Sequence, residues 1–337
     1  MPNISSYTLP QMTDLVERSF QKWLETLPQV MRTSGLVVEE AMPEHTGEYK
    51  RFAERLQRNQ YASVRDEWDI SKKGKVQYGW EKDLQVYTVS LEISITKRMR
   101  KAWKNQDIID QITSLAEVCP NTMDLDLAHR LTFAWSSNYT SRDGVVVDTT
   151  VWDGNPLIYS AHTLTGSATT YSNQITANPT FSKAALENAE KLFVEETYNN
   201  LWEKMMMKPD VIVTTDDPNT CNQVRELLKS TASIADYKND GVINVYKEKY
   251  KHVAVPRIAT TVTGATDTSK KGYRFLASTN DSDFYLSVLE APYLKSPADG
   301  NNGEDFSSEN WNYLTAATYW ICIVTGRWIK GSNGSGS

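Results

Sequence analysis

The chain has 337 residues, a formal net charge of −6 at pH 7, 40% hydrophobic residues and 23% charged residues. A chain of this length can bury a sizeable core and forms either two compact lobes or one elaborated domain. The composition is that of a globular protein and argues against a disordered one. The acidic balance argues against a general basic surface for nucleic acid, so any contact with DNA is expected to be local and non-specific.

No targeting or membrane segment is expected. The N-terminal residues lack a basic start followed by an apolar run, so they do not read as a secretory signal. The most apolar late segment, Tyr313–Gly326, is too short to span a bilayer. Cys119, Cys221 and Cys322 lie about a hundred residues apart. That spacing fits neither a disulfide framework nor a metal site, and we expect buried free thiols in a reducing compartment.

The first hundred residues predict an arm followed by a ribbon. Apolar side chains at helical spacing between two prolines predict a short amphipathic helix over Pro10–Pro28. Ser71–Asp83 is polar and rich in turn residues. Strict alternation of apolar and polar residues then predicts one strand over Leu84–Thr96, about 40 Å long at ~3.3 Å per residue. Because this exceeds the usual strand length, we expect it to project as a ribbon whose apolar face another subunit covers.

A long helix follows the ribbon. Asn105–Val118 carries an apolar stripe, and Met123–Trp135 resumes the same pattern after Pro120. An interior proline removes a helical hydrogen bond and clashes with the preceding turn. The sequence therefore predicts one long helix that is kinked or broken at Pro120.

The second half predicts alternating strands and helices. Ser182 is a suitable N-cap for a helix running to about Lys204. Asp217 and Pro218 predict the start of a helix that ends near Lys229. Strands are predicted at Pro209–Thr215, Gly241–Tyr246, Tyr250–Ile258, Gly272–Ser278 and Ser282–Pro292, followed by a loop at Ser296–Asn310 and a strand pair or one long bent strand within Tyr313–Gly331.

The residues that could carry chemistry do not assemble into a site. His162 lies near Asp153 and several hydroxyl groups, but nucleophilic catalysis also needs a positioned nucleophile. No G-x-S-x-G turn lies near it. We therefore interpret His162 as a loop histidine that bonds to its own turn. His129 within a helix and His252 at the start of a strand are interpreted as structural.

The paired carboxylates have equally plain explanations. Asp216 and Asp217 precede a helix, where capping and the helix dipole favour acids. Neither this pair nor Asp124 and Asp126 matches a calcium loop, and no Walker or Rossmann glycine pattern is present. Two other clusters are explained without a ligand: Lys72–Lys75 as a solvated loop tip, and Met205–Met207 as the apolar end of a helix. We expect no catalytic residue, no cofactor and no metal.

Five segments carry a resemblance to a known family. They are "WDGNPLIYSAHTLTGSATTYSNQ" (Trp152–Gln174), "FSKAALENAEKLF" (Phe181–Phe193), "KPDVIVTTDDPNTCNQVRELLKS" (Lys208–Ser230), "KYKHVAVPRI" (Lys249–Ile258) and "GRWIKG" (Gly326–Gly331). With the order of the elements, they resemble tailed-bacteriophage major capsid proteins of the HK-ninety-seven-like fold and are similar to the Mu-like major head subunits. In such proteins Trp152–Gln174 is an architectural connection, which implies that His162 belongs to its packing.

The resemblance implies an α+β fold with a defined division of the chain. Its parts are an N-terminal arm (1–45), an extended β-hairpin loop (46–96), a peripheral domain with a spine helix (97–150 and 276–305), an axial domain (151–275 and 306–331) and a flexible tail (332–337). About forty residues precede the loop, so we expect a separate scaffolding protein, or none, rather than an internal scaffolding domain.

The implied function is structural rather than enzymatic. The resemblance implies self-assembly into hexamers and pentamers that close an icosahedral shell around double-stranded DNA, bound non-specifically. It also implies a portal, possible decoration proteins, assembly in the host cytoplasm and a final location in the virion. Lys72, Lys73 and Lys75 lie in the loop, but nothing identifies a crosslink acceptor, and no crosslink is expected. Two alternatives stay open: an encapsulin-like nanocompartment shell, and a carbohydrate-active enzyme with two carboxylates facing each other in an aromatic cleft.

Overall fold

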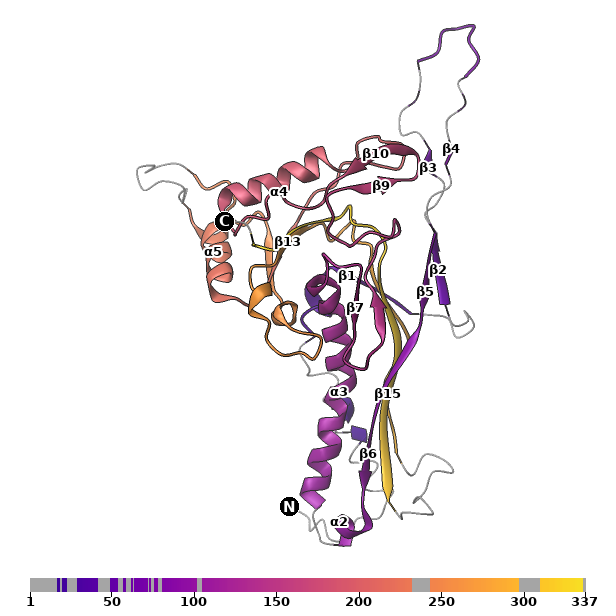
Figure 1. Cartoon of the computed structure of the whole chain (residues 1–337), viewed down its shortest axis with the longest axis vertical. Helices are drawn as coiled ribbons and strands as arrows, with labels where there is room; N and C mark the ends of the chain where they lie inside the picture. Colours follow the sequence, from indigo (N-terminus) through magenta and orange to yellow (C-terminus); the bar gives the residue numbers. More distant parts are fainter. Residues whose placement is uncertain are drawn as a thin grey trace.

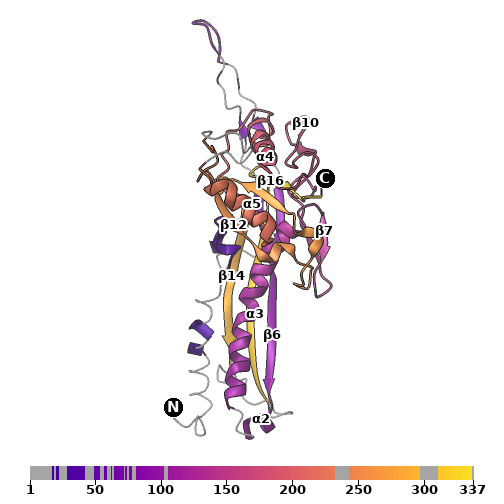
Figure 2. The same ribbon diagram turned by 90° about the vertical axis from the view of Figure 1, so that its left-hand side faces the viewer.

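The computed structural model describes residues 17–18, 20–22, 29–41, 49–53, 57–58, 62, 64–71, 73, 76–77, 81–101, 105–231, 243–296 and 310–335. The protein has a mixed α+β structure. A long four-stranded sheet backed by a long helix extends from a more compact body built on a second four-stranded sheet (Figure 1, Figure 2). In the described ranges, no helix combines the length and apolarity needed to cross a membrane.

The long sheet joins segments from both ends of the chain in the order β1-β14-β15-β6. β1 (Val37–Ala41) runs parallel to β14 (Phe284–Lys295), and β14 pairs antiparallel with β15 (Trp311–Ile323). β6 (Tyr87–Ile95) pairs antiparallel with β15 on its other edge. β15, which the predicted division assigned to the axial domain, thus pairs with β14 and β6 along the long sheet.

The helix α3 (Asn105–Thr132) lies along one face of this sheet (Figure 2). Every fourth residue of its inner stripe is buried: Leu115, Cys119, Met123, Leu127 and Leu131. The predicted long helix is confirmed, but the predicted break is wrong, because the helix continues through Pro120. Packing against the sheet keeps the residues around Pro120 helical. Side chains also donate hydrogen bonds to carbonyl oxygens near the proline. Thr122 Oγ1 donates to the Val118 oxygen at 2.9 Å, and Arg257 Nη1 donates to the Asn121 oxygen at 2.6 Å.

The compact body is built on the sheet β12-β11-β13-β16. β11 (Val211–Thr214) runs parallel to β12 (Lys251–Ala254) and antiparallel to β13 (Arg274–Ala277), which pairs antiparallel with β16 (Ile329–Ser332). The described strands β11, β13 and β16 are buried at every residue. Near-continuous apolar strands are typical of a sheet covered on both faces.

Alternate residues of the compact sheet serve two cores. Val211, Val213, Phe275 and Ala277 join the core formed by α3 and the long sheet. Ile212 and Leu276 point the other way, toward the helices α4 (Lys183–Glu195) and α5 (Pro218–Lys229). The compact sheet is therefore sandwiched between α4 and α5 on one side and the α3 layer on the other.

Both predicted helix starts in the compact body are confirmed. The Ser182 side chain accepts from the Ala185 amide, and the Asp217 side chain accepts from the Thr220 amide. α5 also ends where predicted, at Lys229. The predicted end of α4 near Lys204 is wrong, because the helix stops at Glu195. Asn199 Oδ1 then accepts from the amides of Leu201 and Glu203, which fixes a turn instead of further helix.

The projecting ribbon lies within the predicted extended loop (46–96), but the strand predicted to project is wrong. The segment Leu84–Thr96 divides at Val86 into two strands, of which only the first belongs to the ribbon. The ribbon consists of β2 (Tyr49–Ala53) paired with β5 (Glu81–Gln85) and, further out, β3 (Gln57–Arg58) paired with β4 (Val76–Gln77). Val86 packs against the core of Trp320 and Cys322, at the point where the chain enters the long sheet as β6.

Other predictions have mixed outcomes. The strands predicted at Tyr250–Ile258, Gly272–Ser278 and Ser282–Pro292 contain β12, β13 and most of β14. The segment Tyr313–Gly331 contains most of the long strand β15 and most of the short strand β16. The two strands lie in different sheets and do not pair with each other. Residues 241–242 of the strand predicted at Gly241–Tyr246 lie outside the described residues, and the rest is not a strand, because the chain turns from Val245 onward. The helix end predicted at Met205–Met207 is also wrong, since Met206 is 94% exposed outside any helix.

The chain ends partly fall outside the described residues. Within the predicted helix Pro10–Pro28, Glu17, Arg18 and residues 20–22 are helical, and Phe20 is buried. Most of the predicted loop Ser296–Asn310 lies outside the described ranges. The predicted flexible tail begins too early, because Ser332 is a buried residue of β16. The remaining elements are η2 (Arg32–Ser34), α2 (Lys97–Lys101), β7 (Asn138–Thr140), β8 (Val146–Asp148), β9 (His162–Leu164), β10 (Ser167–Tyr171), η3 (Pro256–Ala259) and η4 (Thr268–Lys270).

Candidate functional site

The ribbon projects away from the body (Figure 1). Exposed apolar side chains lie in the segment between its two outermost strands. Val64, Trp68 and Ile70 are 95%, 93% and 93% exposed. Scattered single apolar residues are normal on a protein surface, but three nearly fully exposed apolar side chains within seven residues, one of them a tryptophan, indicate an interaction site. The tip is therefore the candidate functional surface of the described chain.

The tip is a turn with a defined shape and an acidic character. The Asp69 amide donates to the Asp66 carbonyl oxygen at 3.1 Å, and Arg65 Nη1 donates to Ser71 Oγ at 3.2 Å. Trp68 lies between Glu67 and Asp69 in the sequence, and all three side chains are exposed. The turn thus presents an indole ring flanked by carboxylates.

The root of the ribbon is fixed to the body. Lys82 Nζ on β5 donates to the Thr150 carbonyl oxygen and lies 3.6 Å from Asp148 Oδ2. Val86 anchors the next residues in the core beside Trp320. The ribbon therefore leaves the body from a packed base, which limits the directions in which its tip can point.

The interpretation of His162 as a loop histidine that bonds to its own turn is wrong, because it begins β9 and its partners lie nine and eleven residues away. The residue is closed off from solvent. The side chains of His162 and Asp153 are 0% and 1% exposed, and Nδ1 lies 3.0 Å from Asp153 Oδ2. The other ring nitrogen lies 3.2 Å from Asn173 Oδ1. Asn173 Nδ2 in turn donates to the carbonyl oxygens of Leu157 and Gly326. The cluster ties the Trp152–Gln174 connection to the segment before β16.

The electrostatics of this cluster are those of a buried structural pair. Burial alone would raise the pKa of Asp153. The hydrogen bond and charge of His162, together with hydrogen bonds from Asn155, outweigh burial and lower the pKa of Asp153. The imidazole also stacks on Tyr171, with the ring centroids 5.0 Å apart. Because both ring nitrogens have partners within the fold, the cluster offers no free base for a substrate.

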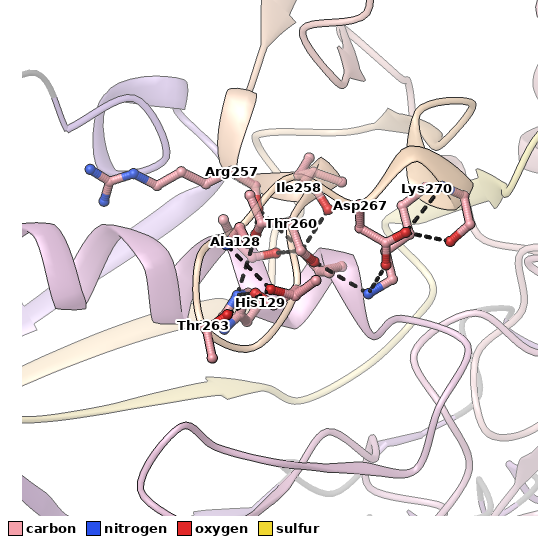
Figure 3. A network of polar contacts seen from close by, with 12 residues as sticks. Ala128, His129, Arg257, Ile258, Thr260, Thr263, Asp267 and Lys270 are labelled. Carbon is pink, nitrogen blue, oxygen red and sulfur yellow. Dashed lines mark hydrogen bonds and ion pairs between the residues drawn. The ribbon is translucent and has the colours of Figure 1, made fainter.

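His129 also has a structural role, as predicted. It faces the loop after η3 (Figure 3), where Nε2 lies 3.2 Å from the Thr261 carbonyl oxygen and 3.4 Å from Thr260 Oγ1. Burial lowers the pKa of His129 to about 4, so the ring is neutral at neutral pH. Lys270 Nζ lies over the neighbouring Phe133 ring at 4.2 Å and donates to the Thr260 carbonyl oxygen. The network fastens this loop to α3.

Asp124 and Asp126 do not form a paired site. Asp124 accepts from the Met31 amide at 3.0 Å and pairs with Arg257 at 3.1 Å. Asp126 instead accepts from the Tyr319 hydroxyl at 2.7 Å. Burial raises the pKa of both carboxyl groups. Each carboxylate attaches α3 to a different neighbour.

A cavity of about 560 Å³ lies between the edge of the long sheet, α3 and the hairpin of β7 and β8. Asp126 and Asp148 both line it, as the carbohydrate-active alternative would require. Asp126 is bound to Tyr319, however, and Asp148 Oδ1 accepts from the Thr150 amide and hydroxyl at 2.8 and 2.7 Å. These two carboxylates are committed to the fold and do not form a free pair of acid and base. A third carboxylate of the lining, Asp143, is exposed, and its Oδ1 lies 3.7 Å from Arg142 Nε.

The other residues singled out from the sequence lie apart from one another. Asp217 caps α5 and Asp216 is exposed. His252 Nε2 lies 2.9 Å from Thr214 Oγ1 on the adjacent strand, and burial lowers its pKa. The three cysteines are buried free thiols, as predicted. Lys73 is exposed, whereas Lys72 and Lys75 lie outside the described residues.

Sequence reasoning missed Lys330, a fully buried cation. Its Nζ donates to the carbonyl oxygens of Glu196 at 3.1 Å and Ser172 at 3.4 Å. The rings of Phe193 and Tyr171 lie 5.4 and 5.8 Å away. Burial lowers the pKa of Lys330 to about 7. Its only sequence signal is that it directly follows the apolar residues Trp328 and Ile329 in the short segment that forms β16.

Comparisons with known proteins support the fold. The sequence matches no protein-family model and no curated protein. A chain from "The capsid of Myoviridae Phage XM1" is 12% identical, with a TM-score of 0.51 over 92% of this chain and 97% of that chain. A chain from Mycobacterium phage Patience is 8% identical, with a TM-score of 0.51 over 98% and 89% of the two chains. The protein thus has the same fold, along nearly its whole length, as a chain of the phage XM1 capsid.

Proposed function

We propose that this protein is the major capsid protein of a tailed bacteriophage and builds the icosahedral head shell around double-stranded DNA. The observation that carries the proposal is the fold shared over 92% of this chain and 97% of the chain from the phage XM1 capsid. The role is structural, and no enzymatic step is assigned to the subunit. The final location is the virion, after assembly in the host cytoplasm.

The elements map onto an HK-ninety-seven-like subunit. The ribbon of β2–β5 and β3–β4 is the extended loop, and α3 is the spine helix. The peripheral domain comprises α3 and the long sheet, which brings β15 into it and revises the boundary placed at residue 306. The axial domain comprises the compact sheet with α4 and α5. The predicted arm, residues 1–45, is shortened to the residues before β1, because β1 pairs with β14 in the long sheet.

Assembly works by repeated heterologous contacts. The axial domains meet in hexamers and pentamers, while the extended loop and the arm of each copy lie across adjacent copies. A heterologous contact closes into a ring when its rotation allows. Each apolar contact contributes roughly 25 cal/mol per Å² buried. Individually weak contacts therefore hold a closed shell, because every subunit makes several of them.

The partners follow from the same assignment. A separate scaffolding protein guides curvature, a portal occupies one vertex, and decoration proteins are possible additions to the outer surface. The net charge of −6 disfavours tight binding of the packaged DNA, so that contact is non-specific.

Negative-stain electron microscopy with light scattering on the same purified sample tests the proposal. Closed shells, tubes or hexagonal sheets are expected, alone or on co-expression with a scaffolding protein. A species that stays monomeric in both preparations would contradict it. The contents of the particles separate the alternatives, because an encapsulin-like shell would enclose protein cargo where a phage head encloses DNA.

A further inference from the structure

The cavity beside the β7–β8 hairpin has the size of a small-molecule site, at about 560 Å³. Each of its walls supplies an apolar side chain: Val89 from β6, Leu125 from α3, Val146 from β8 and Ile321 from β15. Val146 is 64% exposed, so the apolar lining extends to the surface of the protein. The cavity can therefore admit an apolar group from solvent.

A buried arginine lies in the wall of this cavity. Arg130, in the last turn of α3, is 6% exposed. Its Nη1 donates to the Asp148 carbonyl oxygen, but its buried Nε has no hydrogen-bond partner among the described residues. A guanidinium keeps its charge in a protein, and burial of a charge without a partner costs free energy. The unused donor indicates that the fold alone does not complete this site.

The other two cations of the described lining are paired with aspartates. Lys82 Nζ lies 3.6 Å from Asp148 Oδ2, and Arg142 Nε lies 3.7 Å from Asp143 Oδ1. Both aspartate side chains are exposed, whereas Arg130 is buried. Arg130 is thus the cation of this lining that no described salt bridge neutralises.

These charges favour a ligand with one negative charge. The remaining carboxyl group of the lining, that of Asp126, accepts from the Tyr319 hydroxyl at 2.7 Å. Burial raises the pKa of Asp126, which favours its uncharged form and weakens its compensation of Arg130. The exposed Asp143 and Asp148 would repel a second negative charge on a ligand. A monocarboxylate therefore fits the cavity better than a phosphate.

The rest of the ligand is better supplied by an alkyl chain than by a peptide. A peptide brings N–H and carbonyl groups that need hydrogen-bond partners when buried. Several polar groups of the lining are already used: Thr149 Oγ1 donates to the Ser136 carbonyl oxygen at 2.6 Å, Lys82 Nζ donates to the Thr150 carbonyl oxygen, and Asp148 Oδ1 accepts from Thr150. An alkyl chain needs no such partners and gains from burial against the apolar walls.

We propose that this cavity binds an amphipathic monocarboxylate of the fatty-acid class, one per subunit. Its carboxylate lies against the Arg130 guanidinium, and its alkyl chain packs between β8 and β15. The bound acid joins α3, the long sheet and the hairpin at the root of the ribbon, and it stabilises the folded subunit because it binds that state alone. This binding activity goes beyond the structural role and does not depend on shell assembly.

Isothermal titration calorimetry of the purified subunit tests the inference with decanoate, decanol and decyl phosphate, which share one alkyl chain. Decanoate is expected to bind at one site per subunit and about tenfold more tightly than decanol, the effect of a hydrogen bond between charged groups. Decyl phosphate is expected to bind more weakly than decanoate. Absence of saturable binding below the concentration at which decanoate forms micelles would overturn the inference. Equal affinity for the acid and the alcohol, or tighter binding of the phosphate, would also overturn it.

Two variants and a photolabel locate the site. Arg130→Met is expected to abolish the advantage of decanoate over decanol, whereas Lys330→Met, at a buried cation outside the cavity, is the control that keeps it. A decanoate carrying a diazirine labels the unaltered chain, so this readout holds whether or not Arg130→Met folds. The expected labels, identified by mass spectrometry, fall on cavity residues such as Leu125, Val146 and Ile321.

Labels outside the cavity would overturn the inference, and so would an unchanged preference for decanoate in a folded Arg130→Met subunit. None of these measurements requires particles. Failure of decanoate binding would therefore leave the capsid assignment standing, and failure of particle formation would leave the binding site standing.

Discussion

At the scale of single residues, the buried Lys330 ammonium makes stability depend on pH. Burial lowers the pKa of Lys330 from 10.5 to about 7, with smaller opposing effects of Glu196 and Arg327. Between these values the unfolded chain holds a proton that the folded chain has lost. The free energy of unfolding therefore rises with pH in this window, by up to about 1.4 kcal/mol per pH unit.

The variant Lys330→Met isolates that contribution. The free energy of unfolding of this variant should not rise with pH in this window. The difference in free energy of unfolding between the unaltered protein and the variant should therefore increase by roughly 2 kcal/mol from pH 7.5 to pH 9. Urea unfolding at several pH values in this range measures the difference. Subtracting the free energy of the variant from that of the unaltered protein removes the contributions of cysteine and tyrosine titration, which are common to both proteins. Parallel pH profiles would show that Lys330 stays charged in the fold.

Gly326 is a second residue whose small size is required. A Cβ there would lie 2.5 Å from Asn173 Nδ2 and 2.9 Å from the Leu157 carbonyl oxygen. Gly326→Ala should therefore cost about 3 kcal/mol, the upper end for overpacking, because backbone stands in the way. Gly144→Ala is the control: its Cβ meets nothing within 4 Å, and only its φ of +80° costs about 1 kcal/mol. Equal shifts in melting temperature would contradict the role of the Asn173 cluster.

The sequence was informative about residues whose partners are local. Asp217 and Pro218 define the start of α5 through chemistry within one turn, and both were predicted correctly. His162 was correctly interpreted as part of the packing, but its bond to Asn173 joins residues eleven apart and could not be read from spacing. Lys330 was missed because its burial depends on α4 and β10, which are distant in sequence.

At the scale of elements, periodicity located the strands but not their partners. The alternation in Tyr87–Ile95 is the same whether the apolar face meets α3 or another subunit, so it could not tell a sheet strand from a projecting ribbon. The division at Val86 depends on Trp320, more than two hundred residues later. The break predicted at Pro120 was wrong for a similar reason, because α3 is kept continuous by packing against residues that are distant in sequence.

The ribbon itself can be removed cleanly. Deleting residues 74–83 would remove β4 and three of the five residues of β5, and would leave β3 and most of β2 unpaired. Replacing residues 59–75 by a two-residue glycine turn keeps both strand pairs and removes the tip. The shortened subunit should stay folded, with an unchanged melting temperature, yet form no closed particles in electron micrographs. Normal particles would show that the ribbon tip has no role in assembly.

At the scale of the whole molecule, one core joins the two sheets. Val213 and Phe275 of the compact sheet, Leu127 of α3 and Ile321 of the long sheet belong to the same buried cluster. Such a shared core favours cooperative unfolding of both parts and a subunit that moves as a unit. The ribbon extends beyond this core. A change in the ribbon can therefore alter contacts between subunits without lowering the stability of the subunit itself.

Covalent joining of subunits is not expected in the mature particle. Lys73 is exposed on the ribbon, but the sequence identifies no acceptor for its amine. The cysteines are buried within the subunit and cannot form bonds between copies without unfolding. Particles boiled in SDS, with or without reductant, should therefore run as a single band of 38.2 kDa. A ladder that persists in reductant and disappears in Lys73→Arg would show an amide crosslink through the ribbon, and would replace purely non-covalent closure as the source of shell stability.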